Sequence, residues 1–187
     1  KSGYVVLGIG IVIIDYFLLT MYDVLAFKNE KLQLSNLKII FTSFISYAFA
    51  NSIGISGLTG SGLRINLYSL WNVPYKSIIK VIKFCYVSFW VGLLWVGGLF
   101  LTFEPVDLTR FNFYFDTTKE VGIILLIIAA SYSAHKVFSK KKSLEISVFQ
   151  ILISLLDWIL VSGLIYIFLP HSDTLTFIKF FPIFLSA

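Results

Sequence analysis

The stretch Asn51-Ser-Ile-Gly-Ile-Ser-Gly-Leu-Thr-Gly-Ser-Gly-Leu-Arg64 decides how this chain folds, because it breaks an apolar segment with glycines and ends on a cation. Four glycines in the nine residues 54–62 disfavour a helix and favour a turn. The apolar run before them, Ile39–Ile53, spans only about 22 Å as a helix. That is shorter than the roughly 30 Å core of a bilayer. In a membrane, the stretch predicts a re-entrant helical hairpin over about residues 38–76, with its apex near Ser56–Gly62.

The composition indicates that a membrane is the solvent of this chain. Of 187 residues, 58% are hydrophobic and 13% are charged, and the mean hydropathy is +0.89. A soluble domain has about 25% charged and 45–50% apolar residues. The single cysteine, Cys85, excludes an internal disulfide and a cysteine-based metal cluster. The net charge of +5 is typical of cytoplasmic loops rich in lysine, and we do not expect a nucleic-acid partner.

Long apolar blocks predict the helices. Backbone groups in lipid must pair within their own segment, and the blocks lack the period of two that a barrel strand shows. We therefore expect an all-α, polytopic transmembrane helical bundle that forms a single domain over residues 1–187. Because both ends of the sequence lie inside apolar blocks, we also expect it to be an internal part of a longer membrane protein. The blocks cover about residues 4–27, 37–55, 78–103, 121–138 and 144–169, with another starting near 175.

Charged loops predict the orientation of the bundle. The lysine-rich loop 139–143 and the acidic loop 104–120 belong on opposite sides, with the lysines in the cytoplasm. The segments Lys28–Lys38 and Lys76–Lys83 are also lysine-rich, so both should be cytoplasmic. The chain between them must then cross the membrane an even number of times or enter and return. This agrees with the predicted hairpin.

Arg64 is the cation that follows the glycines. A guanidinium beside free backbone N–H groups suits a phosphate oxygen, which it can bind through two bonds, and a glycine-rich backbone can itself form an anion-binding nest. The alternative is that Arg64 extends to the membrane surface and only orients the hairpin. The residues alone leave both interpretations open.

Three acids interrupt the apolar blocks: Asp15, Asp23 and Asp157. A charge within the bilayer is costly and usually functional. Asp23 lies nearer the cytoplasmic end of its block, where it can pair with Arg64 or a neighbouring lysine. For each acid, two interpretations remain open. It has a role in ion coupling or in contacting a headgroup amine, or it forms a purely structural pair.

Sequence motifs for catalysis are missing from the chain. It has no phosphate-binding Walker loop, nucleophile elbow, metal-ligand spacing or dinucleotide fingerprint. The sequence therefore predicts no catalytic residues, no metal site and no cofactor, and it favours a passage or a binding scaffold. It leaves homo-oligomer formation open.

Three segments resemble a known family: Tyr22-Asp23-Val24-Leu25, Ser46–Gly54 with Tyr47-Ala48 and Asn51, and Gly60–Ser69 with Arg64 and Tyr68. Together they resemble the N-terminal membrane region of the bacterial lysylphosphatidylglycerol synthetase/flippase family (MprF). Leu156-Asp157-Trp158 is similar to an acid–tryptophan pair of that family. Ser61 and Asn66 depart from it, because many members have glycine and arginine there.

The resemblance implies a lipid flippase module, without its linked lysyltransferase domain, in the bacterial inner membrane. Its partner would be lysylphosphatidylglycerol or phosphatidylglycerol. Export of the lysyl lipid would lower the negative surface charge of the membrane and so weaken the binding of cationic antimicrobial peptides. Arg64 and the backbone of 54–62 would hold the phosphodiester, while Asp23 or Asp157 faces the lysyl ammonium. A stand-alone transporter of another anionic phospholipid and a structural scaffold for a catalytic domain remain alternatives. The candidate lipid-binding residues are Arg64, Asn51, Gly54, Gly57, Gly60, Gly62, Tyr68, Asp23 and Asp157.

Overall fold

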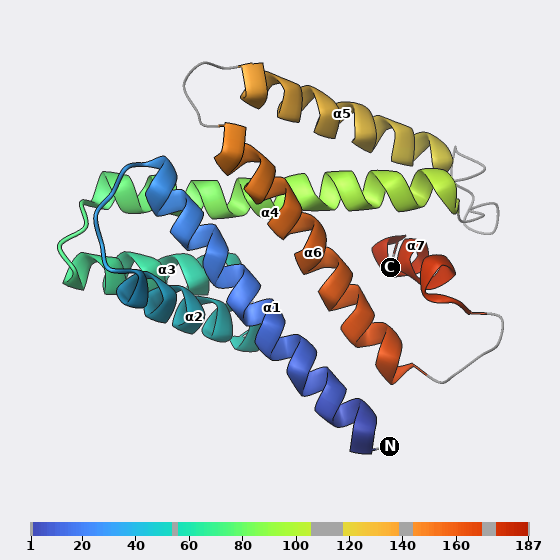
Figure 1. The fold of residues 1–187 in the computed structure, drawn as a ribbon, viewed down its shortest axis with the longest axis horizontal. Coiled ribbons are helices and arrows are strands. Elements are labelled where there is room, and N and C mark those ends of the chain that lie inside the picture. The colour runs from blue at the N-terminus through green and yellow to red at the C-terminus, as the bar shows by residue number, and fades with distance from the viewer. Residues whose placement is uncertain (1, 54–55, 106–117, 139–143, 170–174, 187) are drawn as a thin grey trace.

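The computed structural model describes residues 2–53, 56–105, 118–138, 144–169 and 175–186. Within those ranges every regular element is a helix (Figure 1). The helices run in the order α1 (Ser2–Asn29), α2 (Asn36–Ile53), α3 (Ser56–Leu70), α4 (Tyr75–Phe103), α5 (Lys119–Phe138), α6 (Leu144–Phe168) and α7 (Phe177–Ser186). These bounds follow the predicted apolar blocks closely.

The bundle is that of a membrane protein. Among the described residues, three helices are long and apolar enough to cross a bilayer: Gly3–Asn29, Tyr75–Phe103 and Val148–Phe168. Only 17% of the apolar window of α1 is buried within the protein, compared with 50% of that of α4. Apolar side chains cover the outside of α1 because lipid is their solvent. The predicted all-α membrane bundle is confirmed.

Helix α4 is the central element, since it packs against α1, α3, α5, α6 and α7. Its contact with α6 is close at Gly92. A Cβ atom there would lie 2.8 Å from the carbonyl oxygen of Ser154, so only glycine lets the two backbones approach this far.

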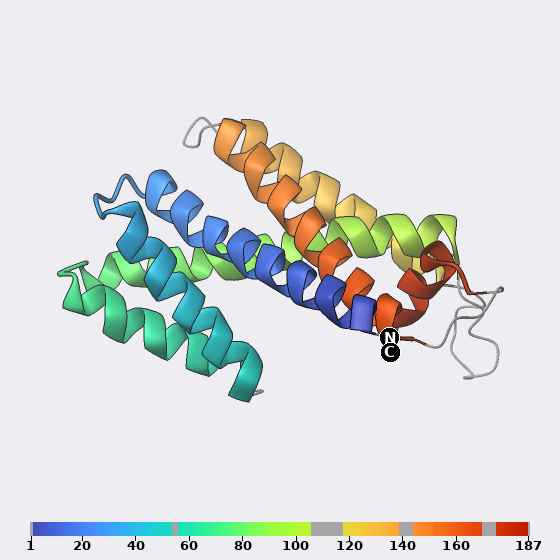
Figure 2. The same cartoon turned by 60° about the horizontal axis from the view of Figure 1, so that its bottom comes forward.

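Helices α2 and α3 form the predicted helical hairpin (Figures 1 and 2). Both of its ends lie at the same end of the bundle, beside the end of α1 and the start of α4. A salt bridge of 3.1 Å between Glu30 and Lys80 ties these two places together. The two lysine-rich segments therefore share one side, as the loop charges predicted.

The predicted position of the apex is wrong. Helix α3 already begins at Ser56, so the glycine-rich residues 56–62 form its first turns and are not the turn between the two helices. Helix propensity is a weak prior that packing overrides. A Cβ at Gly60 would lie 3.2 Å from the Cβ of Ala50 and 3.4 Å from the carbonyl oxygen of Ser46. The glycine thus serves close packing of α3 on α2.

Several predictions fall outside the described residues. They are the role of Gly54, most of the acidic loop and the lysines at 140–142.

Candidate functional site

A buried ion pair joins α1 to the hairpin. Nε and Nη2 of Arg64 donate to Oδ1 and Oδ2 of Asp23 at 3.0 and 2.8 Å. Asp23 is fully buried and Arg64 is 5% exposed. The pairing of Asp23 with Arg64, one of the two partners predicted for it, is confirmed.

Two hydroxyl groups complete the surroundings of the Asp23 carboxylate. Tyr68 donates to Oδ1 and Ser43 donates to Oδ2, both at 2.8 Å. The thiol of Cys85 lies 3.6 Å from Oδ2. Donors from α2, α3 and α4 thus converge on one carboxylate of α1, as a buried charge requires.

Arg64 also has partners beyond Asp23. Its Nη1 donates to the carbonyl oxygen of Gly60 at 3.5 Å, and its guanidinium lies over the ring of Tyr47 at 4.3 Å. The Arg64 side chain points inward and is nearly inaccessible, so the alternative prediction, that it extends to the membrane surface, is wrong. The physical reason is that Asp23 offers the guanidinium a charged, bidentate acceptor inside the bundle.

A second buried polar group joins α1 to α6. Tyr22 donates to Oδ2 of Asp157 at 3.2 Å, and the carboxyl group of Asp15 lies close to that of Asp157. Oδ1 of Asp15 is buried without a hydrogen-bond partner in the described part of the chain. One carboxyl group of α1 and one of α6 therefore lie close together within the apolar bundle. Tyr22, which donates to Asp157, directly precedes Asp23, so the two polar groups are neighbours along α1.

Polar side chains continue from this group along α6 towards α5. Ser154 donates to the carbonyl oxygen of Ser88 at 2.7 Å, and Gln150 donates to the Ser88 hydroxyl at 2.6 Å. Lys136 of α5 donates to the side-chain oxygen of Gln150. Since Ser88, Gln150 and Ser154 are all buried, the bundle contains a polar line from α1 to the end of α5.

The other predicted residues occupy different places. Asn51 is exposed near the tip of α2, where its amide lies 3.5 Å from the Tyr16 hydroxyl. Gly57 and Gly62 belong to the first turns of α3, with Gly60 between them. Of the predicted residues, the structure brings Asp23, Arg64, Tyr68 and Gly60 together, and it places Asp157 in the second group.

Sequence reasoning missed Ser43 and Tyr22. Ser43 is one of several serines and threonines on the buried face of α2, together with Thr42 and Ser46. That polar stripe, at helical spacing within an apolar block, is the signal that could have found it. Tyr22 is adjacent to Asp23, but it reaches the other carboxylate.

Searches against known proteins define what the chain is similar to. No family model matches it. It is 37% identical over 190 residues to the uncharacterized protein slr0712 of Synechocystis, covering 95% of this chain and 59% of that protein. It is 27% identical to the inner membrane protein YbhN of Escherichia coli, covering 91% of this chain and 58% of YbhN. It is 23% identical to phosphatidylglycerol lysyltransferase of Staphylococcus aureus, covering 91% of this chain and 20% of that protein.

Fold and site together define an all-α membrane protein with charged groups paired inside its helical bundle. Its homologues include phosphatidylglycerol lysyltransferase and YbhN, so the predicted resemblance is confirmed and is consistent with the flippase-like region of the lysyltransferase family. The chain spans less than two thirds of the length of each of these relatives. It is thus homologous to a membrane module of a lipid-related protein.

Proposed function

We propose that this chain is a lipid-transport module that moves lysylphosphatidylglycerol from the inner to the outer leaflet of the bacterial inner membrane. Its similarity to phosphatidylglycerol lysyltransferase, over 91% of the chain, supports this substrate. Accumulation of the lysyl lipid outside would reduce negative surface charge and give resistance to cationic antimicrobial peptides.

The observation that carries the proposal is the buried Asp23–Arg64 pair, which joins α1 to the hairpin of α2 and α3. A lysyl lipid headgroup contains both an anion, the phosphodiester, and cationic amines. If the headgroup enters between the two side chains, its phosphate takes the place of Asp23 on Arg64. Its ammonium then takes the place of Arg64 on Asp23.

Such an exchange solves the main energetic problem of moving a charged headgroup through lipid. Removing one partner of a buried ion pair leaves an uncompensated charge and costs about 3–5 kcal/mol. An exchange of one pair for two leaves Asp23, Arg64, the phosphodiester and one ammonium group all paired. Tyr68 and Ser43 already donate to Asp23 and keep it oriented when Arg64 moves away.

The remaining predicted residues have supporting places in this proposal. Asn51 is exposed near the hairpin tip, where it is available to headgroup oxygens. Gly57, Gly60 and Gly62 lie in the turns of α3 that precede Arg64. Gly60 is packed against α2, whereas nothing lies within 4 Å of a Cβ added at Gly62, so a phosphate approaching the guanidinium has room beside Gly62. Asp157 offers a second carboxyl group to an amine that has left Asp23.

The similarities also favour a second candidate, a stand-alone transporter of another anionic phospholipid. The chain is more similar to slr0712 and YbhN than to the lysyltransferase, and neither of those two proteins is named as a transferase. In that case Arg64 would still bind the phosphate, while Asp23 would need a different cation.

The decisive experiment separates transport from synthesis. The full chain is expressed in bacteria that lack their own lysyl lipid and receive a separate synthetase domain. Total lysylphosphatidylglycerol is measured in extracts, and its exposed fraction is measured on intact cells with a membrane-impermeant amine reagent. Exposure that depends on the chain supports the first function. Exposure at the level of cells without the chain, at equal synthesis, rules it out and leaves the stand-alone transporter to be tested with phosphatidylglycerol.

A paired variant then distinguishes headgroup binding from a structural role. Asp23→Leu with Arg64→Met replaces the buried pair by apolar side chains, which is often neutral for stability. We expect this variant to fold and to lose transport. Folding with full transport would show that the pair is a scaffold only. Lys80→Gln, which removes an exposed salt bridge, is the control and should transport normally.

A further inference from the structure

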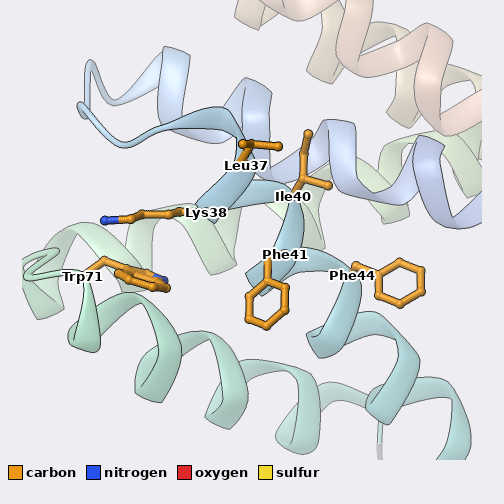
Figure 3. Close-up of a pocket in the computed structure, with 6 residues that line it drawn as sticks. All are labelled: Leu37, Lys38, Ile40, Phe41, Phe44 and Trp71. Carbon is orange, nitrogen blue, oxygen red and sulfur yellow. The ribbon is translucent and has the colours of Figure 1, made fainter.

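A groove on the outer face of the hairpin lies away from the buried ion pair. It has a volume of about 580 Å³ and opens between α2 and the end of α3 (Figure 3). Its floor is apolar, and the side chains that form it on α2 are largely exposed, with Leu37 at 80% and Phe41 at 55%. The residues that line it are Leu37, Lys38, Ile40, Phe41, Phe44 and Trp71.

One end of this groove is polar. The ammonium group of Lys38 lies 4.2 Å from the centre of the Trp71 ring. Lys38 is exposed, and no carboxylate of the described residues forms a salt bridge with it. The indole N–H of Trp71 is buried and has no acceptor among the described residues. In Figure 3 the ring closes the end of the groove beneath Lys38.

The polar end lies where the membrane surface must be. Lys38 is in the first turn of α2 and Trp71 follows directly after α3, at the same end as Glu30 and Lys80. Tryptophan and lysine are typical of the membrane–water interface. Anionic lipids are drawn to cationic groups at this depth.

We propose that this groove binds one molecule of an anionic phospholipid from the cytoplasmic leaflet. One acyl chain lies along Phe41 and Phe44, and the phosphate pairs with Lys38 above the ring of Trp71. An apolar floor and, at its polar end, a cation without a carboxylate together match the acyl chain and the phosphate of such a lipid. This site does not depend on the transport proposal, because it uses neither Asp23 nor Arg64.

The test is native mass spectrometry of the full chain, released from detergent that contains equal amounts of phosphatidylglycerol and phosphatidylcholine. We expect phosphatidylglycerol to remain bound preferentially. One basic side chain near the surface contributes about 1 kcal/mol, so Lys38→Gln should reduce the preference about fivefold. Lys83→Gln, an exposed lysine on α4 outside the groove, should have no effect.

Two results would overturn the inference. One is equal retention of both lipids by the unaltered chain, which would mean that the groove holds only general membrane lipid. The other is an equal loss of preference in Lys83→Gln and Lys38→Gln. That result would mean that the preference for phosphatidylglycerol comes from the overall positive charge at this end of the bundle and not from the groove. Each can occur whether or not the chain transports lipid, so it leaves the transport proposal untouched.

Discussion

Arg64 donates hydrogen bonds to both carboxylate oxygens of Asp23, at 3.0 and 2.8 Å, although the two residues are 41 positions apart in the sequence. The pair is the only one of the two described salt bridges that is buried; the other, Glu30–Lys80, has its lysine side chain 63% exposed. A buried pair of this kind makes the hairpin and α1 depend on each other.

Arg64→Ala should therefore destabilise the protein strongly. The variant leaves Asp23 buried without its cation, and we expect a loss of about 3–5 kcal/mol in the free energy of unfolding. The measurement is denaturant unfolding in detergent micelles. Lys80→Ala serves as the control, since an exposed pair contributes about 0–1 kcal/mol. Equal, small losses in the two variants would contradict the structural role of the buried pair.

Tyr22→Phe tests the second polar group. The substitution removes the hydroxyl that donates to Asp157 and keeps the ring. We expect a loss of about 1–3 kcal/mol, because a buried carboxyl group loses a partner. The same substitution in an Asp157→Leu background should have a smaller effect. If the losses simply add, the two residues do not interact in the folded protein.

Gly92→Ala tests the close contact of α4 with α6. The new Cβ would meet backbone atoms of Ser154, which cannot move aside alone, so we expect a loss of about 1–3 kcal/mol. Gly163→Ala is the matched control on α6, where no atom lies within 4 Å of the added Cβ. It should instead stabilise the helix by about 0.5–1 kcal/mol. A thermal unfolding series of both variants checks the opposite signs.

Cysteine labelling tests the hairpin topology. Cys85 is buried and is the only cysteine of the chain, so a Cys85→Ser background is suitable. New cysteines at Lys31 and Lys76 should react with an impermeant maleimide from the cytoplasmic side only. Reaction of these two from opposite sides would mean that the segment between them crosses the membrane, which would refute the re-entrant hairpin.

The helices of this protein could be predicted from its sequence because lipid imposes a simple rule. Apolar blocks such as 78–103 must be helical in a membrane, and the structure places α4 at Tyr75–Phe103. The hairpin was predictable because two lysine-rich segments required the same side. The apex was not, since the propensity of glycine describes an isolated helix and omits the contact of Gly60 with Ala50.

The candidate site was predictable only in part. Asp23 and Arg64 stood out because each is an ion in an apolar segment, and few partners were available to them. Local patterns do not show which helices are neighbours, so the meeting of Asp15 with Asp157 could not be derived. The donor Ser43 could not be derived because its contact with Asp23 depends on the rotation of α2 about its axis, which packing determines.

The separation of Asp23 from Arg64 also has a consequence for biogenesis. Ribosomes add about 5–20 residues per second, so Arg64 emerges roughly 2–8 s after Asp23, given the 41 residues between them. During that interval α1 carries a carboxylate whose cation does not yet exist. Until the hairpin arrives with its counter-ion, α1 can bury that carboxyl group in lipid only as the neutral acid.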